Sequence, residues 1–129
     1  GVVAGGSSVE DGLVAGRDLL SRSPRPTAII AQSDLLALGV IRAAEELGLS
    51  VPDDLSVLGF DGVRIEGAAP HELTTLVQPA VDKGRAAGGA VIALLNGDRP
   101  EPSRFTSQLR IGTTTAPAPS SAAPSSGSA

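Results

Sequence analysis

The sequence predicts an open α/β fold in which a parallel sheet is flanked by helices. Short apolar runs without polar alternation recur along the chain, as is typical of strands covered on both faces. Segments with apolar residues at helical spacing separate these runs. The alternation continues through residues 1–117 and stops before residues 118–129. We therefore expect one folded unit over 1–117 and a tail over 118–129.

The first part of the chain predicts a short strand-like run followed by a helix. The run "GVVAGG" is apolar until glycines stop it. Apolar residues then recur at helical spacing over 8–23. Ser8, or neighbouring Ser7, suits the N-cap of this helix, and Glu10 and Asp11 suit its positive N-terminus.

The next part predicts strand, helix, turn and strand. "RPTAIIAQ" is a continuous apolar strand, and "SDLLALGVIRAAEELG" is the clearest helix in the chain. Gly48 is a suitable stop for this helix, and "LSVPDD" is a turn that leads to the buried strand "LSVLGF". The apolar stripe of the helix is expected at Ala37, Val40, Ile41, Ala44 and Leu47.

The last part predicts a strand, a helix, an edge strand and the tail. "ELTTLVQP" is a strand stopped by Pro79, and residues 103–114 alternate in part, as suits an edge strand. Residues 116–129 contain only Ala, Pro, Ser and Gly, so we expect them to be disordered. A helix is expected over 80–97, with an apolar face at Val81, Ala87 or Gly88, Val91, Ile92 and Leu95.

Composition excludes several classes of function. Ten Lys and Arg against 14 Asp and Glu give a net charge of −4, which argues against nucleic-acid binding by this segment alone. Without cysteine, and with one histidine, the chain offers neither a disulfide framework nor a common zinc site. No nucleophile–base arrangement is visible, so we expect no enzyme and no cofactor. We also expect no membrane span.

The chain begins at a glycine and contains no methionine. We therefore interpret it as a piece of a longer gene product or as a processed chain. No secretory leader precedes the first strand-like run, although a mature secreted protein would also lack one.

Two carboxylates follow predicted strands, at the edge where parallel α/β sheets bind ligands. Asp34 follows "TAIIAQS" and Asp61 follows "LSVLGF". Carboxylates there suit a neutral polyol or nucleoside, because they accept hydrogen bonds from hydroxyl and N–H groups. Two structural alternatives stay open: Asp34 is the N-cap of the next helix, which begins at Ser33 or Asp34, and Asp61 before Gly62 is a turn residue.

Several spaced motifs resemble the lactose-repressor (LacI/GalR) family of bacterial transcription regulators. They include "PTAIIAQSDLLALG", "VPDDLSVLGFDG", "LTTLVQP", "LLNG" and "TTTAP". The resemblance covers about residues 3–117. It implies the C-terminal subdomain of an effector domain that looks like a type I periplasmic sugar-binding protein. It further implies that the helix over 80–96 packs on an N-terminal subdomain, and that a helix-turn-helix reads DNA, both outside this chain.

The resemblance implies roles for individual residues. Asp61 matches the family's ligand-binding aspartate. Ser33 matches a position usually held by asparagine beside Asp34, and Ser7 falls where many members place an aromatic ring on the ligand. Gln78 lies at the crossover and is expected to line the cleft.

The resemblance also implies that the helix that begins at Asp34 forms part of a dimer interface, with Leu38 among its contacts. In addition, Gly112 occupies a place often held by arginine.

These expectations combine into one hypothesis about function. The chain is the effector-sensing and dimerisation module of a cytoplasmic LacI-type DNA-binding regulator. It binds a sugar or nucleoside-like effector, forms a homodimer and controls transcription through the full-length protein. Two alternatives stay open: a periplasmic sugar-binding protein of a transporter, and an orphan fragment with only dimerisation contacts.

Overall fold

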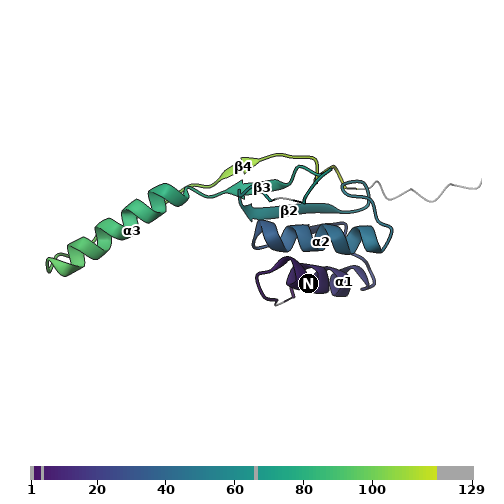
Figure 1. Cartoon of the computed structure of the whole chain (residues 1–129), viewed down its shortest axis with the longest axis horizontal. Coiled ribbons are helices and arrows are strands. Elements are labelled where there is room, and N and C mark those ends of the chain that lie inside the picture. Colours follow the sequence, from purple (N-terminus) through teal and green to yellow (C-terminus); the bar gives the residue numbers. More distant parts are fainter. Residues whose placement is uncertain (1, 4, 66, 119–129) are drawn as a thin grey trace, which may run out of the picture.

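The structure is a computed structural model that describes residues 2–3, 5–65 and 67–118. Helices and strands alternate along most of the chain, as the sequence predicted (Figure 1). In chain order they are α1 (Val9–Leu20), β1 (Ala28–Ile30), α2 (Asp34–Glu46), β2 (Ser56–Asp61), β3 (Thr74–Val77), α3 (Ala80–Leu95) and β4 (Gln108–Arg110).

The four strands form one sheet in the order β1-β2-β3-β4. β1, β2 and β3 are parallel, while β4 returns antiparallel to β3 at the edge. Gly59 of β2 pairs with Thr75 of β3, and Asp61 pairs with Val77. The predicted α/β fold is thus confirmed, as is an edge strand late in the chain, whose antiparallel direction the sequence did not predict.

The helices that cover the sheet lie on one face of it. α2 packs against β2, and α1 packs against the far side of α2, so sheet, α2 and α1 form three layers (Figure 1). The sequence predicted a sheet covered on both faces, and the described helices do not provide the second cover. Accordingly, β1 shows a buried Ile29 beside an Ile30 that is 78% exposed.

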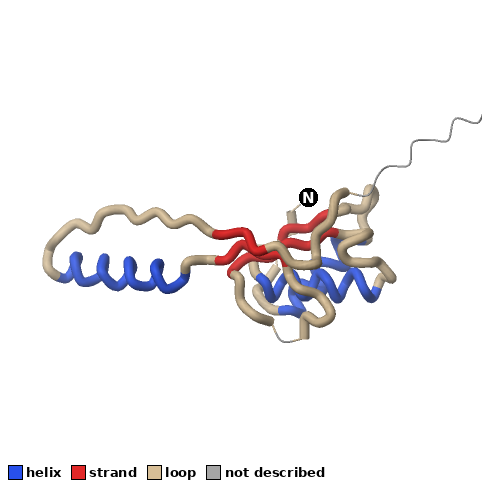
Figure 2. Tube along the Cα trace, turned by 90° about the horizontal axis from the view of Figure 1, so that it is seen from above, coloured by secondary structure: helices blue, strands red, loops and turns tan. Residues whose placement is uncertain are grey.

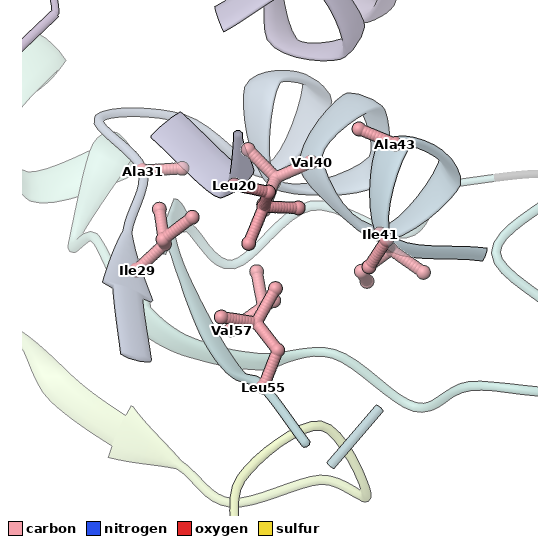
Figure 3. Packing of buried hydrophobic residues seen from close by; sticks show 10 residues of the cluster. Leu20, Ile29, Ala31, Val40, Ile41, Ala43, Leu55 and Val57 are labelled. Carbon is pink, nitrogen blue, oxygen red and sulfur yellow. The ribbon is translucent and has the colours of Figure 1, made fainter. Parts of the chain in front are cut away.

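The hydrophobic core lies between β1, β2, α2 and α1 (Figure 3). Four of the five residues predicted for the α2 stripe are buried in it, whereas Leu47 is 50% exposed. Aliphatic side chains and alanines fill this core, namely Leu20, Ile29, Ala31, Ala37, Val40, Ile41, Ala43, Ala44, Leu55 and Val57. Small residues on α2 therefore let the helices approach closely.

Glycines make the closest approach of α1 to α2 possible. A Cβ atom on Gly39 would overlap the carbonyl oxygen of Val9, and one on Gly12 would overlap the carbonyl oxygen of Leu36. A Cβ atom on Gly16 would lie 2.8 Å from the Cβ of Ala43. Backbone thus contacts backbone at this interface, and a larger residue would force the helices apart.

α1 begins at a capping box, which confirms Ser8 as its N-cap. The Ser8 hydroxyl accepts a hydrogen bond from the Asp11 amide at 3.1 Å, and the Asp11 carboxylate accepts from the Ser8 amide at 2.9 Å. The Ser8 hydroxyl also donates to this carboxylate at 2.6 Å. These bonds satisfy backbone donors that a helix N-terminus otherwise leaves free.

α3 projects away from the sheet and buries none of its residues (Figures 1 and 2). The chain returns from its far end to β4 as a loop (Figure 2). The predicted helix is confirmed, but its apolar face is uncovered, with Leu95 81% exposed. No helix among the described residues combines the length and apolarity needed to cross a bilayer.

Two sequence predictions meet a different outcome at the chain ends and edges, and a third is not tested. Val2 and Val3 belong to no strand, although the run that contains them was predicted to be strand-like. β4 is shorter than predicted, because residues 103–107 lie in the loop that precedes it. The predicted disordered tail lies outside the described residues from 119 onward.

Replacing Gly39 with alanine should destabilise the fold. The new methyl group meets the α1 backbone, so we expect the free energy of unfolding to fall by about 1–3 kcal/mol, as for other overpacked cores. Gly84 of α3 is the matched control, because a Cβ there meets nothing within 4 Å. Gly84→Ala should preserve or raise helicity. Urea unfolding followed by circular dichroism compares the two, and equal stability of both variants would contradict the packing described above.

The capping box also predicts a pH effect at Asp11. Hydrogen bonds from the Ser8 hydroxyl and the Ser8 amide lower the pKa of the Asp11 carboxyl below its ordinary value of 3.8. A lowered folded-state pKa stabilises the helix above the unfolded pKa, and that contribution is lost as pH falls through the folded value. Ser8→Ala should therefore raise the Asp11 pKa towards 3.8 in a carboxyl NMR titration. An unchanged pKa would show that Ser8 does not hold this carboxylate.

Candidate functional site

The carboxyl ends of the parallel strands bring several predicted site residues to one edge of the sheet. Ser33 follows β1, Asp61 ends β2, and Gln78 follows β3. Because the three strands are parallel, these positions share an edge. Ser7 lies at the same end, since Gly12 of α1 faces Leu36 near the start of α2 and the two helices run in the same direction.

Asp61 is the exposed carboxylate of this edge. It has a backbone φ of +116°, a region that side-chain-bearing residues rarely adopt. Its carbonyl oxygen accepts a hydrogen bond from the Gln78 amide at 3.0 Å. No hydrogen bond or ion pair among the described residues engages its carboxylate. The side chain is therefore free to bind a ligand, and the strained backbone that presents it lowers stability by about 1–3 kcal/mol.

Asp34 has a different surrounding, and the structure corrects its predicted role as a ligand contact. Its side chain is 0% exposed. One carboxylate oxygen accepts hydrogen bonds from the amides of Gly62 and Val63, both at 2.8 Å, and the other accepts from the Thr75 hydroxyl at 2.5 Å. No ion pair among the described residues includes it. The carboxylate is thus committed to the protein interior.

The burial of this charge is compensated locally. Hydrogen bonds to a carboxylate are about twice as strong as those between neutral groups. Asp34 is also the first residue of α2, where the helix dipole favours a negative charge. Gly59 makes room for it, because a Cβ on Gly59 would overlap one of the Asp34 carboxylate oxygens.

Ser33, and not Asp34, is the N-cap of α2, so the N-cap alternative for Asp34 is wrong. Its hydroxyl accepts a hydrogen bond from the Leu36 amide at 3.2 Å. The hydroxyl keeps its own proton as a donor. A ligand contact by Ser33 stays a prediction that this geometry permits.

Gln78 lies at the predicted crossover, but its amide is engaged within the chain. The Gln78 side-chain nitrogen donates to the Ser107 hydroxyl at 2.6 Å, and its oxygen accepts from the Lys83 ammonium. The side chain therefore ties the start of α3 to the segment that precedes β4. A ligand contact by Gln78 would require these bonds to rearrange.

Leu38, predicted as a dimer contact, is 4% exposed within this chain. Its side chain has almost no surface left to offer a partner, so the burial does not favour the predicted contact. Leu35, one turn earlier on α2, is 43% exposed.

Two polar residues near Asp61 escaped the sequence analysis. Thr75 is fully buried and donates to Asp34. Arg110 of β4 reaches across the sheet and donates to the Gly62 carbonyl at 3.2 Å, which brings a positive charge to the turn after Asp61. "LTTLVQP" contains Thr75, but its apolar context identifies only a strand, and nothing local in the sequence links Arg110 to Gly62.

A groove of about 820 Å³ lies elsewhere, along the open edge of β1. Its lining is mostly apolar and includes Val3, Leu19, Ile30 and Leu36, but not Asp61 or Gln78. Among the described residues, no cluster of three or more acidic or histidine side chains could hold a metal ion. Asp61 is exposed, and it does not line this groove.

Comparison with known families identifies the chain. Residues 2–115 match the model of the periplasmic binding protein-like domain. The chain is 41% identical over 86 residues to catabolite control protein A of Priestia megaterium, and the aligned residues cover 67% of this chain and 26% of that protein. It is 39% identical over 101 residues to the HTH-type transcriptional repressor PurR of Yersinia pestis, with 78% and 30% covered.

Solved structures agree with this match. A LacI family transcriptional regulator from Bifidobacterium animalis has a TM-score of 0.79 and 32% identity, with 90% of this chain and 43% of that chain covered. A regulator from Arthrobacter in complex with lactose has a TM-score of 0.70 and 27% identity, with 87% and 44% covered. One from Enterococcus faecium with bound ribose has a TM-score of 0.70 and 27% identity, with 88% and 42% covered.

The chain spans less than a third of the length of the two curated relatives and less than half of these solved chains. The family match over residues 2–115 includes every described helix and strand. The chain belongs to the periplasmic binding protein-like domain family, in the form that LacI family transcriptional regulators carry.

Proposed function

We propose that this chain is the effector-sensing and dimerisation module of a LacI-type DNA-binding transcriptional regulator. The observation that carries the proposal is Asp61, an exposed carboxylate without a partner among the described residues, held at a φ of +116° at the carboxyl edge of the parallel sheet. Because strain of this kind lowers stability, its presence favours a functional role over a turn role.

The chemistry around Asp61 suits a neutral, hydroxyl-rich ligand. A carboxylate accepts hydrogen bonds from two or more hydroxyl groups. The guanidinium of Arg110, one of whose N–H groups binds the Gly62 carbonyl, supplies further donors beside it. The similar regulators solved with lactose and ribose support a sugar or a nucleoside-like molecule as the effector.

The effector site is shared with a second subdomain in this proposal. Asp61 lies on an open edge, and α3 exposes its apolar face. An N-terminal subdomain, as the resemblance to LacI-type regulators implies, would cover both. Effector binding between the two halves would favour one hinge state over the other. In a homodimer that change would alter the geometry of two helix-turn-helix heads, and with it the affinity for DNA.

Cytoplasmic location and the absence of catalysis belong to the same proposal. The similarity to named transcriptional repressors and regulators supports both. The dimer contact would use the exposed part of the α2 surface, such as Leu35, rather than the buried Leu38.

Binding of lactose and ribose to the intact regulator tests the role of Asp61. Asp61→Asn removes the charge at nearly constant size and should weaken binding by about tenfold or more, since hydrogen bonds to charged groups contribute 1.5–3 kcal/mol, roughly. Asp53→Asn is the matched control, because Asp53 is an exposed aspartate in the turn before β2. Calorimetric titration measures both variants. Equal affinity of wild type and Asp61→Asn for a sugar that binds would remove Asp61 from the site.

The strain at Asp61 predicts a separation of stability from function. Asp61→Gly relieves a backbone conformation that glycine adopts freely, whereas Asp61→Ala keeps the strain. We expect the free energy of unfolding of Asp61→Gly to be about 1 kcal/mol higher than that of Asp61→Ala. Neither variant should bind the effector. Urea unfolding of both variants checks the order, and the reverse order would show that Asp61 is not strained.

A further inference from the structure

We infer that Asp34 and Thr75 are positioning residues, which hold the Asp61–Gly62–Val63 turn and so place the Asp61 carboxylate for its ligand. The inference rests on the proposed function and extends it to two buried residues. It begins with the two amides that Asp34 binds, which belong to the two residues directly after Asp61. One carboxylate group therefore ties both residues to the start of α2.

The turn is held from three sides. Asp34 binds its amides from the α2 side. Gly62, at a φ of +81°, lies so close to β3 that a Cβ there would be 2.7 Å from the Cα of Val77. Arg110 binds the Gly62 carbonyl from β4. This constraint explains how Asp61 keeps a φ that its side chain disfavours, since strained residues persist only where surrounding contacts over-determine them.

Thr75 controls the orientation of the Asp34 carboxylate. Its hydroxyl binds the oxygen that does not bind the turn, and it comes from β3, a different element. Loss of this donor would leave a buried carboxylate oxygen unsatisfied, which is unfavourable for a charged group. The carboxylate would then turn away from Gly62 and Val63 to find another donor, and the turn would loosen.

Amide hydrogen exchange of Gly62 and Val63 in the full chain tests this inference without a ligand. Thr75→Val replaces the hydroxyl by a methyl group of similar size, and Thr75→Ser restores it. Thr74→Val is the matched control: Thr74 is also buried, but its hydroxyl accepts from the Gly112 amide at 3.0 Å and contacts the Thr115 hydroxyl. The Thr74→Val variant therefore disturbs a neighbouring hydrogen-bond network that does not reach the turn.

We expect Thr75→Val to speed exchange at Gly62 and Val63 by about tenfold or more relative to Thr74→Val, which corresponds to a lost hydrogen bond to a charged group. Thr75→Ser should return exchange to wild-type rates. Asp34→Asn should act like Thr75→Val, and where that variant fails to fold, the threonine series decides. Equal exchange in Thr75→Val and Thr74→Val would overturn the inference.

Titration of the intact regulator with ribose and lactose supplies the second readout. Thr75→Val should weaken the binding that Asp61 supports by about tenfold, while Thr74→Val and Thr75→Ser leave it unchanged. Unchanged affinity in Thr75→Val, with a loosened turn, would overturn the positioning role. If neither sugar binds wild type, the assignment of these two sugars as effectors fails by itself, and the exchange rates still decide whether Asp34 and Thr75 hold the turn.

Discussion

The buried carboxylate of Asp34 is the interaction on which the carboxyl edge of this sheet depends. It joins the first turn of α2, the turn after β2 and the middle of β3 through three hydrogen bonds. A charge with 0% exposure is tolerated there because each bond is charge-assisted and the helix N-terminus adds a favourable field. Gly59 follows from the same constraint, since a Cβ there would overlap the Asp34 carboxylate, whereas Gly62 leaves room for Val77 of β3.

The rest of the fold supports this edge by close packing on one side of the sheet. Glycines on α1 and α2 bring the two helices together, and the core of small and aliphatic residues holds α2 on β2. Rigid elements of this kind fix the first residue of α2, and therefore Asp34, relative to the strands. By contrast, α3 stands apart with its apolar face exposed. The chain thus combines a well-packed layer with a surface that suits a further subdomain.

The order of helices and strands could be predicted from the sequence, because apolar periodicity and turn residues report it locally. Ser8 and Gly48 marked helix ends correctly for the same reason. The different roles of Asp34 and Asp61, the two aspartates that follow strands, could not be predicted. Both carboxylates follow an apolar run, and only their surroundings distinguish the buried Asp34 from the exposed Asp61. Those surroundings come from Gly62, Val63 and Thr75, which are 28 to 41 residues away in the sequence.

Leu38 shows the same limit, since a stripe of apolar residues on α2 does not say which side of the helix packs against the rest of this chain.

The measurement that tests the account most directly is NMR detection of scalar couplings across hydrogen bonds in the wild-type chain. The account predicts correlations from the Asp34 carboxyl carbon to the amide nitrogens of both Gly62 and Val63. Protected amides at these residues that correlate with another acceptor would contradict it, because Asp34 would then not hold the turn that presents Asp61.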